Sequence, residues 1–391
     1  MKKNVFVILI IFMFCNMSIH AGKWEIVQLP DVSNDWTIES ISFPSSDKGW
    51  AVGSSRFGKR ADLTLEGVIL KYHKGKWENI TPPVVSSNWF LSAVCFVSND
   101  EGWAAGGDIE NNKGVILHYK NGNWTQDKVP TTYAYLDEKG WSVDDLSFLN
   151  DSEGWAVGGT LQRKGKGGVI LHYKNGIWSP EGDKELLKGH VLSCVDAVSA
   201  GDVWVGGQNE GKKFNSRDVM VGSTSFSRPW GSFELHSDKS VFVKVKQPVF
   251  LKNVIRNKYY FFGPDNGWCV GIFPTTPPNA KEMNYEGRLL QWNGSKWKNI
   301  KLDYNSKWWY LEAIDFSSEK NGWIVGYDVK KKKGVLAEYK KGKISFISKK
   351  NLPEVSEDWG LFDVANTGEN QFWAAGTDYK GSKGVILHYT E

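Results

Sequence analysis

The chain has 391 residues, of which 41% are hydrophobic and 24% are charged, ordinary values for a folded globular protein that exclude intrinsic disorder. The 20 Trp and 41 Gly are unusual, but the glycines do not recur at every third position, which excludes collagen. With 48 Lys and Arg against 44 Asp and Glu, the net charge is +4, so we expect no general nucleic-acid partner.

Residues 1–21 have the form of a signal peptide. Two lysines precede an apolar run over residues 5–15, which is too short to cross a bilayer, since a crossing takes about 20 residues. Small or apolar side chains then precede Gly22 at the positions that signal peptidase reads, which predicts cleavage after Ala21. We therefore expect an exported protein, periplasmic or secreted to the cell surface, with no transmembrane segment in the mature chain.

Three short phrases recur along the mature chain. The central phrase reads Gly-Trp-Ala-Val-Gly in its commonest form and occurs seven times, with its tryptophans at Trp50, Trp103, Trp155, Trp204, Trp268, Trp323 and Trp373. A phrase of the type Trp-x-Leu-x-x-Val-x-Phe precedes it, and a phrase of the type Gly-Val-Ile-Leu-His-Tyr follows it, with a turn and another Trp after that. Apolar residues alternate with polar or small ones, and Asn-Gly turns separate the runs, which indicates short strands and hairpins.

Seven repeats of four short strands, A to D, predict an all-β fold, a seven-bladed β-propeller with four antiparallel strands per blade. The last repeat lacks strand D, and residues 22–30 resemble that missing strand. We therefore expect the N-terminal strand to complete blade 7 and close the ring of a single domain, 22–391. The expected blades are 31–83, 84–132, 133–183, 184–247 with an insertion at 207–231, 248–303, 304–352 and 353–391.

The turn between strands C and D, as at Tyr119–Trp124, is similar to a degenerate BNR or Asp-box. Together with the Gly-Trp-Ala-Val-Gly phrase, it makes the whole mature chain resemble the photosystem II stability/assembly factor-like propellers. That resemblance implies an exported, seven-bladed, non-enzymatic protein that acts as an assembly chaperone.

Asp-boxes also occur in sialidases and other glycoside hydrolases, so catalytic groups were sought. A sialidase needs an arginine cluster, and the mature chain has only seven Arg and no Arg-Ile-Pro phrase. Several acidic residues lie on expected inner strands, where alternation would turn one of each pair toward the axis: Asp144, Asp145, Asp196, Glu312 and Asp315. We interpret them as solvated channel groups and assign no catalytic residue, although a paired-carboxylate hydrolase stays open as a less favoured alternative.

Metal and disulfide sites are not indicated. One repeat position carries histidine in four different blades, too far apart to hold a single ion: His118, His172, His236 and His388. Cys95, Cys194 and Cys269 remain after signal cleavage, and three cysteines cannot all pair internally. We expect buried free thiols, with no metal and no cofactor.

The D–A and B–C loops of a propeller gather on one face, where we expect binding. Five tryptophans and one histidine precede strand A and should ring the channel mouth, either exposed to a ligand or packed under neighbouring loops: Trp36, Trp89, Trp141, His190, Trp309 and Trp359. The B–C loops carry 18 Lys and Arg against 10 Asp and Glu. Their densest basic positions are Arg163, Lys164, Lys166, Lys330, Lys331, Lys332 and Lys333, and the insertion adds Phe214 and Trp230.

We conclude from the sequence that the chain is an exported, non-enzymatic, monomeric binding or scaffold propeller. Its loop face would engage a protein or an anionic polymer, because a one-sided positive charge favours an acidic partner. The alternative is a carbohydrate-directed protein that binds a glycan, either a lectin or, less favoured, a glycoside hydrolase.

Overall fold

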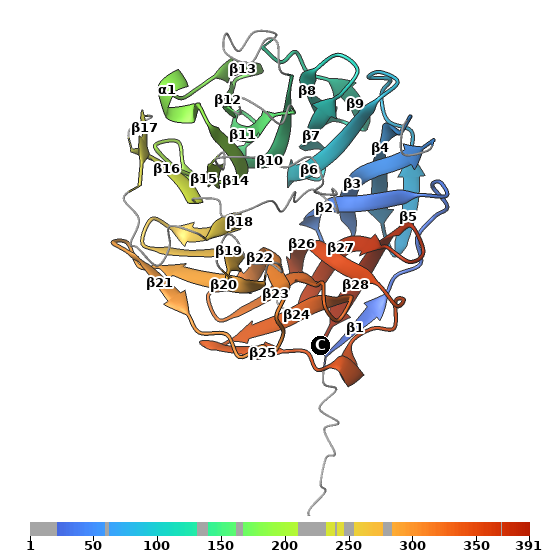
Figure 1. The fold of residues 1–391 in the computed structure, drawn as a ribbon. Coiled ribbons are helices and arrows are strands. Elements are labelled where there is room, and N and C mark those ends of the chain that lie inside the picture. The colour runs from blue at the N-terminus through green and yellow to red at the C-terminus, as the bar shows by residue number, and fades with distance from the viewer. Residues whose placement is uncertain are drawn as a thin grey trace, which may run out of the picture.

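The computed structural model describes residues 22–58, 62–130, 140–161, 167–209, 232–238, 241–245, 254–276, 284–368 and 370–391. The expected signal peptide, 1–21, lies outside the described residues. Seven four-stranded antiparallel sheets surround a common axis, as Figure 1 shows. The predicted seven-bladed β-propeller is confirmed.

Within each blade the first strand lies at the axis and the last at the outer edge. Blade 1 comprises β2 (Trp36–Ser45), β3 (Lys48–Phe57), β4 (Thr64–His73) and β5 (Lys76–Ile80); blade 2 comprises β6 (Trp89–Ser98), β7 (Glu101–Asp108), β8 (Lys113–Lys120) and β9 (Asn123–Gln126). Blade 3 comprises β10 (Trp141–Asn150), β11 (Glu153–Thr160), β12 (Gly168–Lys174) and β13 (Ile177–Pro180); blade 4 comprises β14 (His190–Ser199), β15 (Asp202–Asn209), β16 (Ser232–Asp238) and β17 (Val241–Lys244). Blade 5 comprises β18 (Ile255–Gly263), β19 (Asn266–Pro274), β20 (Tyr285–Trp292) and β21 (Trp297–Ile300); blade 6 comprises β22 (Trp309–Ser318), β23 (Asn321–Asp328), β24 (Lys333–Lys340) and β25 (Lys343–Phe346). Blade 7 comprises β26 (Trp359–Gly368), β27 (Gln371–Asp378), β28 (Lys383–Thr390) and the N-terminal β1 (Lys23–Ile26).

Helical structure is limited, in the described ranges, to one turn of α-helix, α1 (Lys184–Leu187), and one 3-10 turn, η2 (Lys349–Asn351). No helix in these ranges has the length and apolar character needed to cross a membrane.

The ring closes through the N-terminal strand. β1 pairs antiparallel with β28, with Trp24 opposite Tyr389, and Figure 1 shows the blue first strand beside the red last strands. Blade 7, completed by β1, then packs against blade 1, where Trp373 stacks on Phe43 with ring centroids 4.9 Å apart. The predicted closure is confirmed, and the closing junction is packed by the same Trp–Phe contact as other junctions, such as Trp50 on Phe96.

The glycines of the central phrase mark close contacts between strands A and B. A Cβ placed on Gly53, the last residue of the phrase, would lie 2.0 Å from the carbonyl oxygen of Thr37. The equivalent glycine of every other blade has a strand-A carbonyl oxygen at 1.9–2.1 Å from such a Cβ. Only glycine leaves space for this approach. The last glycine of the phrase therefore marks the point where strand B lies closest to strand A.

The three cysteines lack disulfide partners. Cys194 and Cys269 are fully buried in one apolar cluster at the junction of blades 4 and 5. Cys95 is only partly buried, and burial raises its pKa to about 11. A high pKa leaves little thiolate at neutral pH, so these are structural thiols rather than nucleophiles.

Candidate functional site

A β-bulge recurs in every innermost strand. In blade 3 the register jumps from Val143 to Asp145, so Asp144 has no partner on β11. The same shift occurs near the start of all seven innermost strands. The seven extra residues are Glu39, Ser92, Asp144, Ser193, Asn257, Glu312 and Phe362. A bulged residue leaves the ladder and is re-aimed, and here all seven line one cavity.

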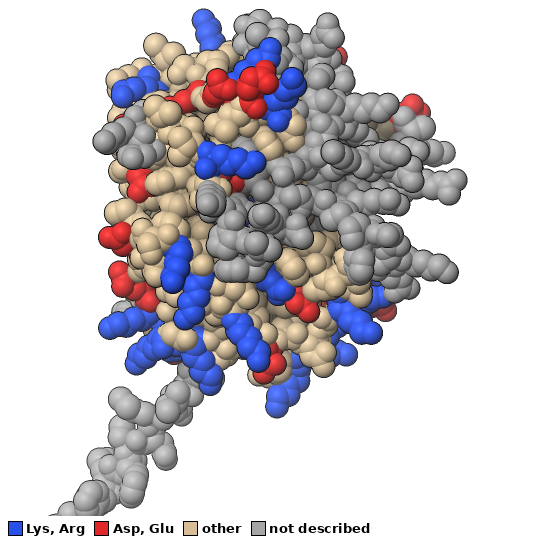
Figure 2. Space-filling view, turned by 60° about the vertical axis from the view of Figure 1, so that its left-hand side comes forward, with Lys and Arg blue, Asp and Glu red and all other residues tan. Residues whose placement is uncertain are grey.

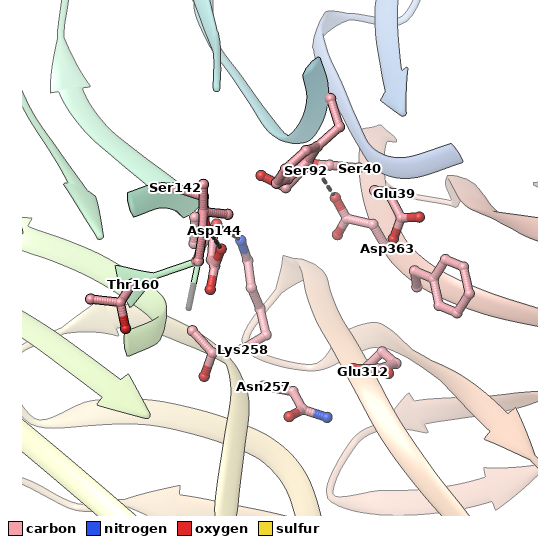
Figure 3. A pocket seen from close by; sticks show the side chains of 15 residues that line it. Glu39, Ser40, Ser92, Ser142, Asp144, Thr160, Asn257, Lys258, Glu312 and Asp363 are labelled. Carbon is pink, nitrogen blue, oxygen red and sulfur yellow. Dashed lines mark hydrogen bonds and ion pairs between the residues drawn. The ribbon is translucent and has the colours of Figure 1, made fainter. Parts of the chain in front are cut away.

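This cavity, called the mouth below, lies at the centre of the ring and has a volume of about 340 Å³. All seven innermost strands contribute to its lining, and Thr160 and Leu161, where a B–C loop begins, also line it. The starts of strands A and the ends of strands B meet at the D–A and B–C loop face, so the mouth opens on the face where the sequence predicted binding. Figure 3 shows its polar side chains converging from several strands.

The mouth is acidic. Its described lining holds five carboxyl groups and one amine, Lys258. The Lys258 Nζ atom lies 2.7 Å from Asp145 Oδ1. Asp145 also accepts a hydrogen bond from the Val195 backbone N–H, at 3.0 Å. Lys258 is therefore engaged by Asp145, and its charge also acts on Asp363.

Some inner carboxylates tie neighbouring blades together. Asp363 accepts hydrogen bonds from the Ser40 hydroxyl, at 2.8 Å, and from the Ile41 N–H, at 3.0 Å, across the junction of blades 7 and 1. Asp196 accepts from the Phe261 N–H at 2.7 Å, and Asp315 accepts from the Asn366 N–H at 2.6 Å. These groups bond to a neighbouring blade, whereas the hydrogen bond that Asp144 accepts comes from Ser142 on its own strand.

The expectation that one member of each acidic pair faces the channel is corrected for Asp144 and Asp145. Both line the mouth. In a regular strand, alternation would point their side chains to opposite faces, but the bulge at Asp144 breaks that alternation. Glu312, by contrast, makes no hydrogen bond or ion pair with any residue in the described ranges.

Burial raises the pKa of the carboxyls at the mouth. It raises the pKa of Glu312 from 4.5 to about 8, with further repulsion from Glu39. It also raises the pKa of Asp144 to about 7. A hydrogen bond from Ser142 lowers that pKa in part, and the charge of Asp145 raises it further. The pKa of Glu39 is also raised, mainly by burial. An added cation would favour the ionised form of all three.

We expect the raised pKa of Glu312 to make the fold less stable at high pH. The folded chain holds a proton that the unfolded chain releases above its ordinary pKa of 4.5, so this stabilisation is present at low pH and is lost as the pH rises through about 8. The unfolding free energy of Glu312→Gln should therefore fall less than that of the wild type between about pH 5 and pH 9. Urea unfolding at several pH values measures this, with the exposed Glu66→Gln as control, and parallel wild-type and Glu312→Gln profiles would contradict it.

The structure places the five predicted mouth tryptophans in the core, so of the two alternatives left open by the sequence they are packed and not exposed to a ligand. Each is at most 4% exposed: Trp36, Trp89, Trp141, Trp309 and Trp359. The Trp89 ring lies over Gly67 of the preceding blade, where a Cβ would lie 2.3 Å from it. The other four cover the equivalent glycines, Gly384, Gly114, Gly287 and Gly334. The packed alternative is what the fold adopts, and only His190 remains partly exposed.

The predicted basic positions are only partly described. Arg163, Lys164, Lys166, Phe214 and Trp230 lie outside the described residues. Lys330, Lys331 and Lys332 are exposed on the loop between β23 and β24, and Lys333 is half-buried.

Internal acceptors bind three of the four lysines. Lys331 lies 3.3 Å from Asp328, and Lys332 lies 3.2 Å from Asp358. The Lys333 amine donates to the Ser356 carbonyl. This run is therefore less available to an acidic partner than the sequence suggested.

The recurrent histidines complete a packing motif. His118 stacks on Trp103 with ring centroids 4.6 Å apart, and its Nε2 atom lies 2.7 Å from Glu101. His172 and His236 repeat this arrangement of Trp, His and an acidic residue in blades 3 and 4. No three His, Cys, Asp or Glu side chains within the described ranges are placed to hold a metal ion.

The sequence analysis did not identify a buried charged network between blades 4 and 5. Arg256 and Glu234 are fully buried and lie 3.0 Å apart. Tyr259 and Trp297 each donate a hydrogen bond to Glu234, at 3.1 and 2.8 Å. In the other blades aliphatic residues occupy the places of Glu234, Arg256 and Tyr259, as Ile116, Leu91 and Val94 do in blade 2. These three departures from the repeat are visible in the sequence and could have indicated the network.

The outer wall differs from the mouth in charge. In the view of Figure 2, Lys and Arg gather toward the lower edge, and Asp and Glu are interspersed among them. No extended region of one sign covers the visible described surface, so the mouth is the more distinctive electrostatic feature.

Comparison with solved structures gives a likeness of fold. YCF48 bound to D1 peptide shares 16% identity over 94% of this chain and 97% of that chain, with a TM-score of 0.59. YCF48 from Cyanidioschyzon merolae shares 14% identity over 94% and 98%, with a TM-score of 0.53. The polysaccharide lyase Uly1 shares 11% identity over 90% and 89%, with a TM-score of 0.52. No protein-family model and no curated protein matches the chain. Because YCF48 is a photosystem II assembly factor, the resemblance found in the sequence is confirmed as a likeness of fold.

Proposed function

We propose that this chain is an exported, non-catalytic propeller that holds a segment of a partner protein at the mouth. The observation that carries the proposal is the ring of seven bulge residues, because it brings side chains from all blades to one cavity. Ser92, Ser193 and Asn257 also bond to the next blade, whereas Glu39, Asp144, Glu312 and Phe362 make no such bond between blades within the described ranges and present their side chains to the cavity. The peptide in the YCF48 structure supports a protein ligand for this architecture.

The composition of the mouth also supports binding rather than catalysis. Its described lining contains no His, Cys or Tyr side chain, so its serines have no imidazole base among the lining residues to activate them. The one amine, Lys258, is held by Asp145. Burial lowers the pKa of Lys258, but Asp145 and Asp363 outweigh burial and raise it above its ordinary value, which removes the free base that a catalytic lysine needs.

A glycan-directed role is the second candidate. It is favoured by one observation, the neighbouring carboxyls of Glu39 and Glu312, of which Glu312 has a pKa of about 8. A protonated and an ionised carboxyl are the acid and base of a glycoside hydrolase. A lectin with seven equivalent sugar sites is disfavoured, because the bulge residues differ from blade to blade. Release of reducing ends from a glycan panel, abolished by Glu312→Gln, would support the hydrolase.

Photo-crosslinking in the native host tests the peptide-binding proposal. A benzophenone amino acid at position 362, in the mouth, replaces one aromatic residue with another. The matched control carries it at position 177, an exposed residue on the outer strand β13. We expect position 362 to capture one defined protein segment, which a synthetic peptide of that segment displaces, and position 177 to capture none of it. Capture of the same proteins from both positions would contradict the proposal.

A further inference from the structure

Exposed apolar side chains gather on the loop face of blades 1 and 2. Phe57 and Leu63 flank the B–C loop of blade 1, Val84 lies in the connection from β5 to β6, and Ile109 follows β7. Their exposed fractions are 44%, 45%, 95% and 36%. We call these four residues the apolar rim. The other large apolar side chains of comparable exposure in the described ranges lie on the outer strands β1, β13 and β17.

Asn88 holds the loops of the apolar rim together. Its side-chain oxygen accepts a hydrogen bond from the Leu65 N–H at 3.0 Å, and its backbone carbonyl accepts one from the Ile109 N–H at 2.8 Å. Asn88 therefore anchors the backbone at Ile109 and two residues after Leu63. Such a platform binds with a smaller loss of conformational entropy than a free loop does.

Phe90 connects the lining of the mouth to the strand that Ile109 follows. Phe90, on β6, lines the mouth and pairs with Gly107 on β7. A Cβ on Gly107 would lie 2.8 Å from the Phe90 ring, and Gly107 is two residues before Ile109. The mouth and the apolar rim therefore lie on the same loop face, at the ends of two paired strands of blade 2.

The mouth can accept a cation. Glu39, Asp144 and Glu312 contribute three carboxyls to its lining, and Glu312 makes no hydrogen bond or ion pair with any residue in the described ranges. The one amine of the described lining, Lys258, is held by Asp145 at 2.7 Å. A Lys or Arg side chain of a ligand suits these carboxyls, since hydrogen bonds between oppositely charged groups are the strongest that a peptide offers.

We propose that the mouth and the apolar rim form one docking surface, which takes an extended peptide segment with a Lys or Arg side chain in the mouth and aliphatic side chains on the rim. This inference rests on the proposed function and names the chemistry of the partner. It differs from the acidic partner expected from the sequence, because the described part of the loop face has carboxyl groups at its centre. A polyamine would satisfy the mouth alone, and only a chain with both kinds of side chain uses both surfaces.

A random 12-residue peptide display library tests the proposal with the intact protein. We expect the wild type to enrich peptides that have a Lys or Arg beside two or more aliphatic residues. Enrichment of peptides without a basic residue would overturn this inference and leave the proposed function standing. If no peptide is enriched, both the inference and the proposed function fail.

Matched variants separate the two parts of the surface. Glu39→Gln with Asp144→Asn and Glu312→Gln should abolish the selection for Lys or Arg and weaken an enriched peptide about tenfold or more, mostly at low salt. Leu63→Ser with Val84→Ser and Ile109→Ser should abolish the selection for aliphatic residues. Ile26→Ser with Ile177→Ser, on the outer strands, is the control and should change neither. Equal loss of binding in the control, or retention of the basic preference in the carboxyl variant, would overturn the proposal, and unchanged urea midpoints show that each variant is folded.

Discussion

A chain that lacks residues 22–30 should unfold at a much lower denaturant concentration than a chain that begins at Gly22. The deletion removes β1, and with it the ladder to β28 and the hydrogen bond from the Val27 N–H to Ile386. It also removes Trp24, which is 4% exposed and packs edge-on against Trp323 with ring centroids 5.0 Å apart. Loss of a buried Trp destabilises by about 3–5 kcal/mol, so we expect a total of more than about 5 kcal/mol when the ladder is included.

The point variant Trp24→Ala distinguishes packing from closure. It should reproduce the part of the loss that comes from the side chain, while the full deletion adds an uncovered edge on β28 and a tendency to associate through it. Urea unfolding monitored by Trp fluorescence, with sedimentation for association, measures both effects. A deleted chain with the same midpoint as the chain beginning at Gly22 would show that β1 does not close the ring.

The second large effect concerns the buried pair of Arg256 and Glu234. Arg256→Leu should lower the unfolding free energy by about 3–5 kcal/mol, because it leaves Glu234 charged, fully buried and without its counter-ion. Glu234→Ile should have a similar effect by leaving Arg256 uncompensated. The double variant restores the aliphatic pair of the other blades, so we expect it to recover most of the lost stability.

A double-mutant cycle measures the coupling between these two positions. The coupling energy should be favourable and about several kcal/mol. Each single variant leaves one buried charge without a counter-ion, whereas the double variant leaves none. Tyr259→Phe is the matched control: it removes one hydrogen bond of 3.1 Å to Glu234 and should have a smaller effect, about 1–3 kcal/mol. Additive losses in the double variant would contradict this account of the network.

The repeats predicted the ring because the residues of each phrase make the contacts between strands and between blades. Gly53 and its equivalents allow strand A to pass close to strand B, and Trp50 stacks on the next blade. Such local rules are readable from one chain, and so is the closing strand, since residues 22–30 complete a phrase that the last repeat leaves unfinished.

The candidate site was only partly predictable, for three physical reasons. A bulge cannot be recognised from an alternating sequence pattern, so it could not be inferred that Asp144 and Asp145 both line the mouth. The burial of Trp89 depends on the absence of a side chain at Gly67, in the preceding repeat. Glu234 and Arg256 depart visibly from the aliphatic residues of the other repeats, but their pairing becomes evident only when blades 4 and 5 are placed side by side.

The ring of bulges also bears on how such a protein diversifies. Residues in the ladder must satisfy a partner strand and a packed face, whereas a bulge residue has no ladder partner. Three of the seven still bond to the next blade, because Ser92, Ser193 and Asn257 donate to the carbonyl oxygens of Val143, Arg256 and Leu311. The other four, at positions 39, 144, 312 and 362, can change identity without breaking such a bond between blades, and they converge on one cavity of about 340 Å³. Substitution at these four positions would vary specificity on an unchanged scaffold, and in this chain they are Glu, Asp, Glu and Phe.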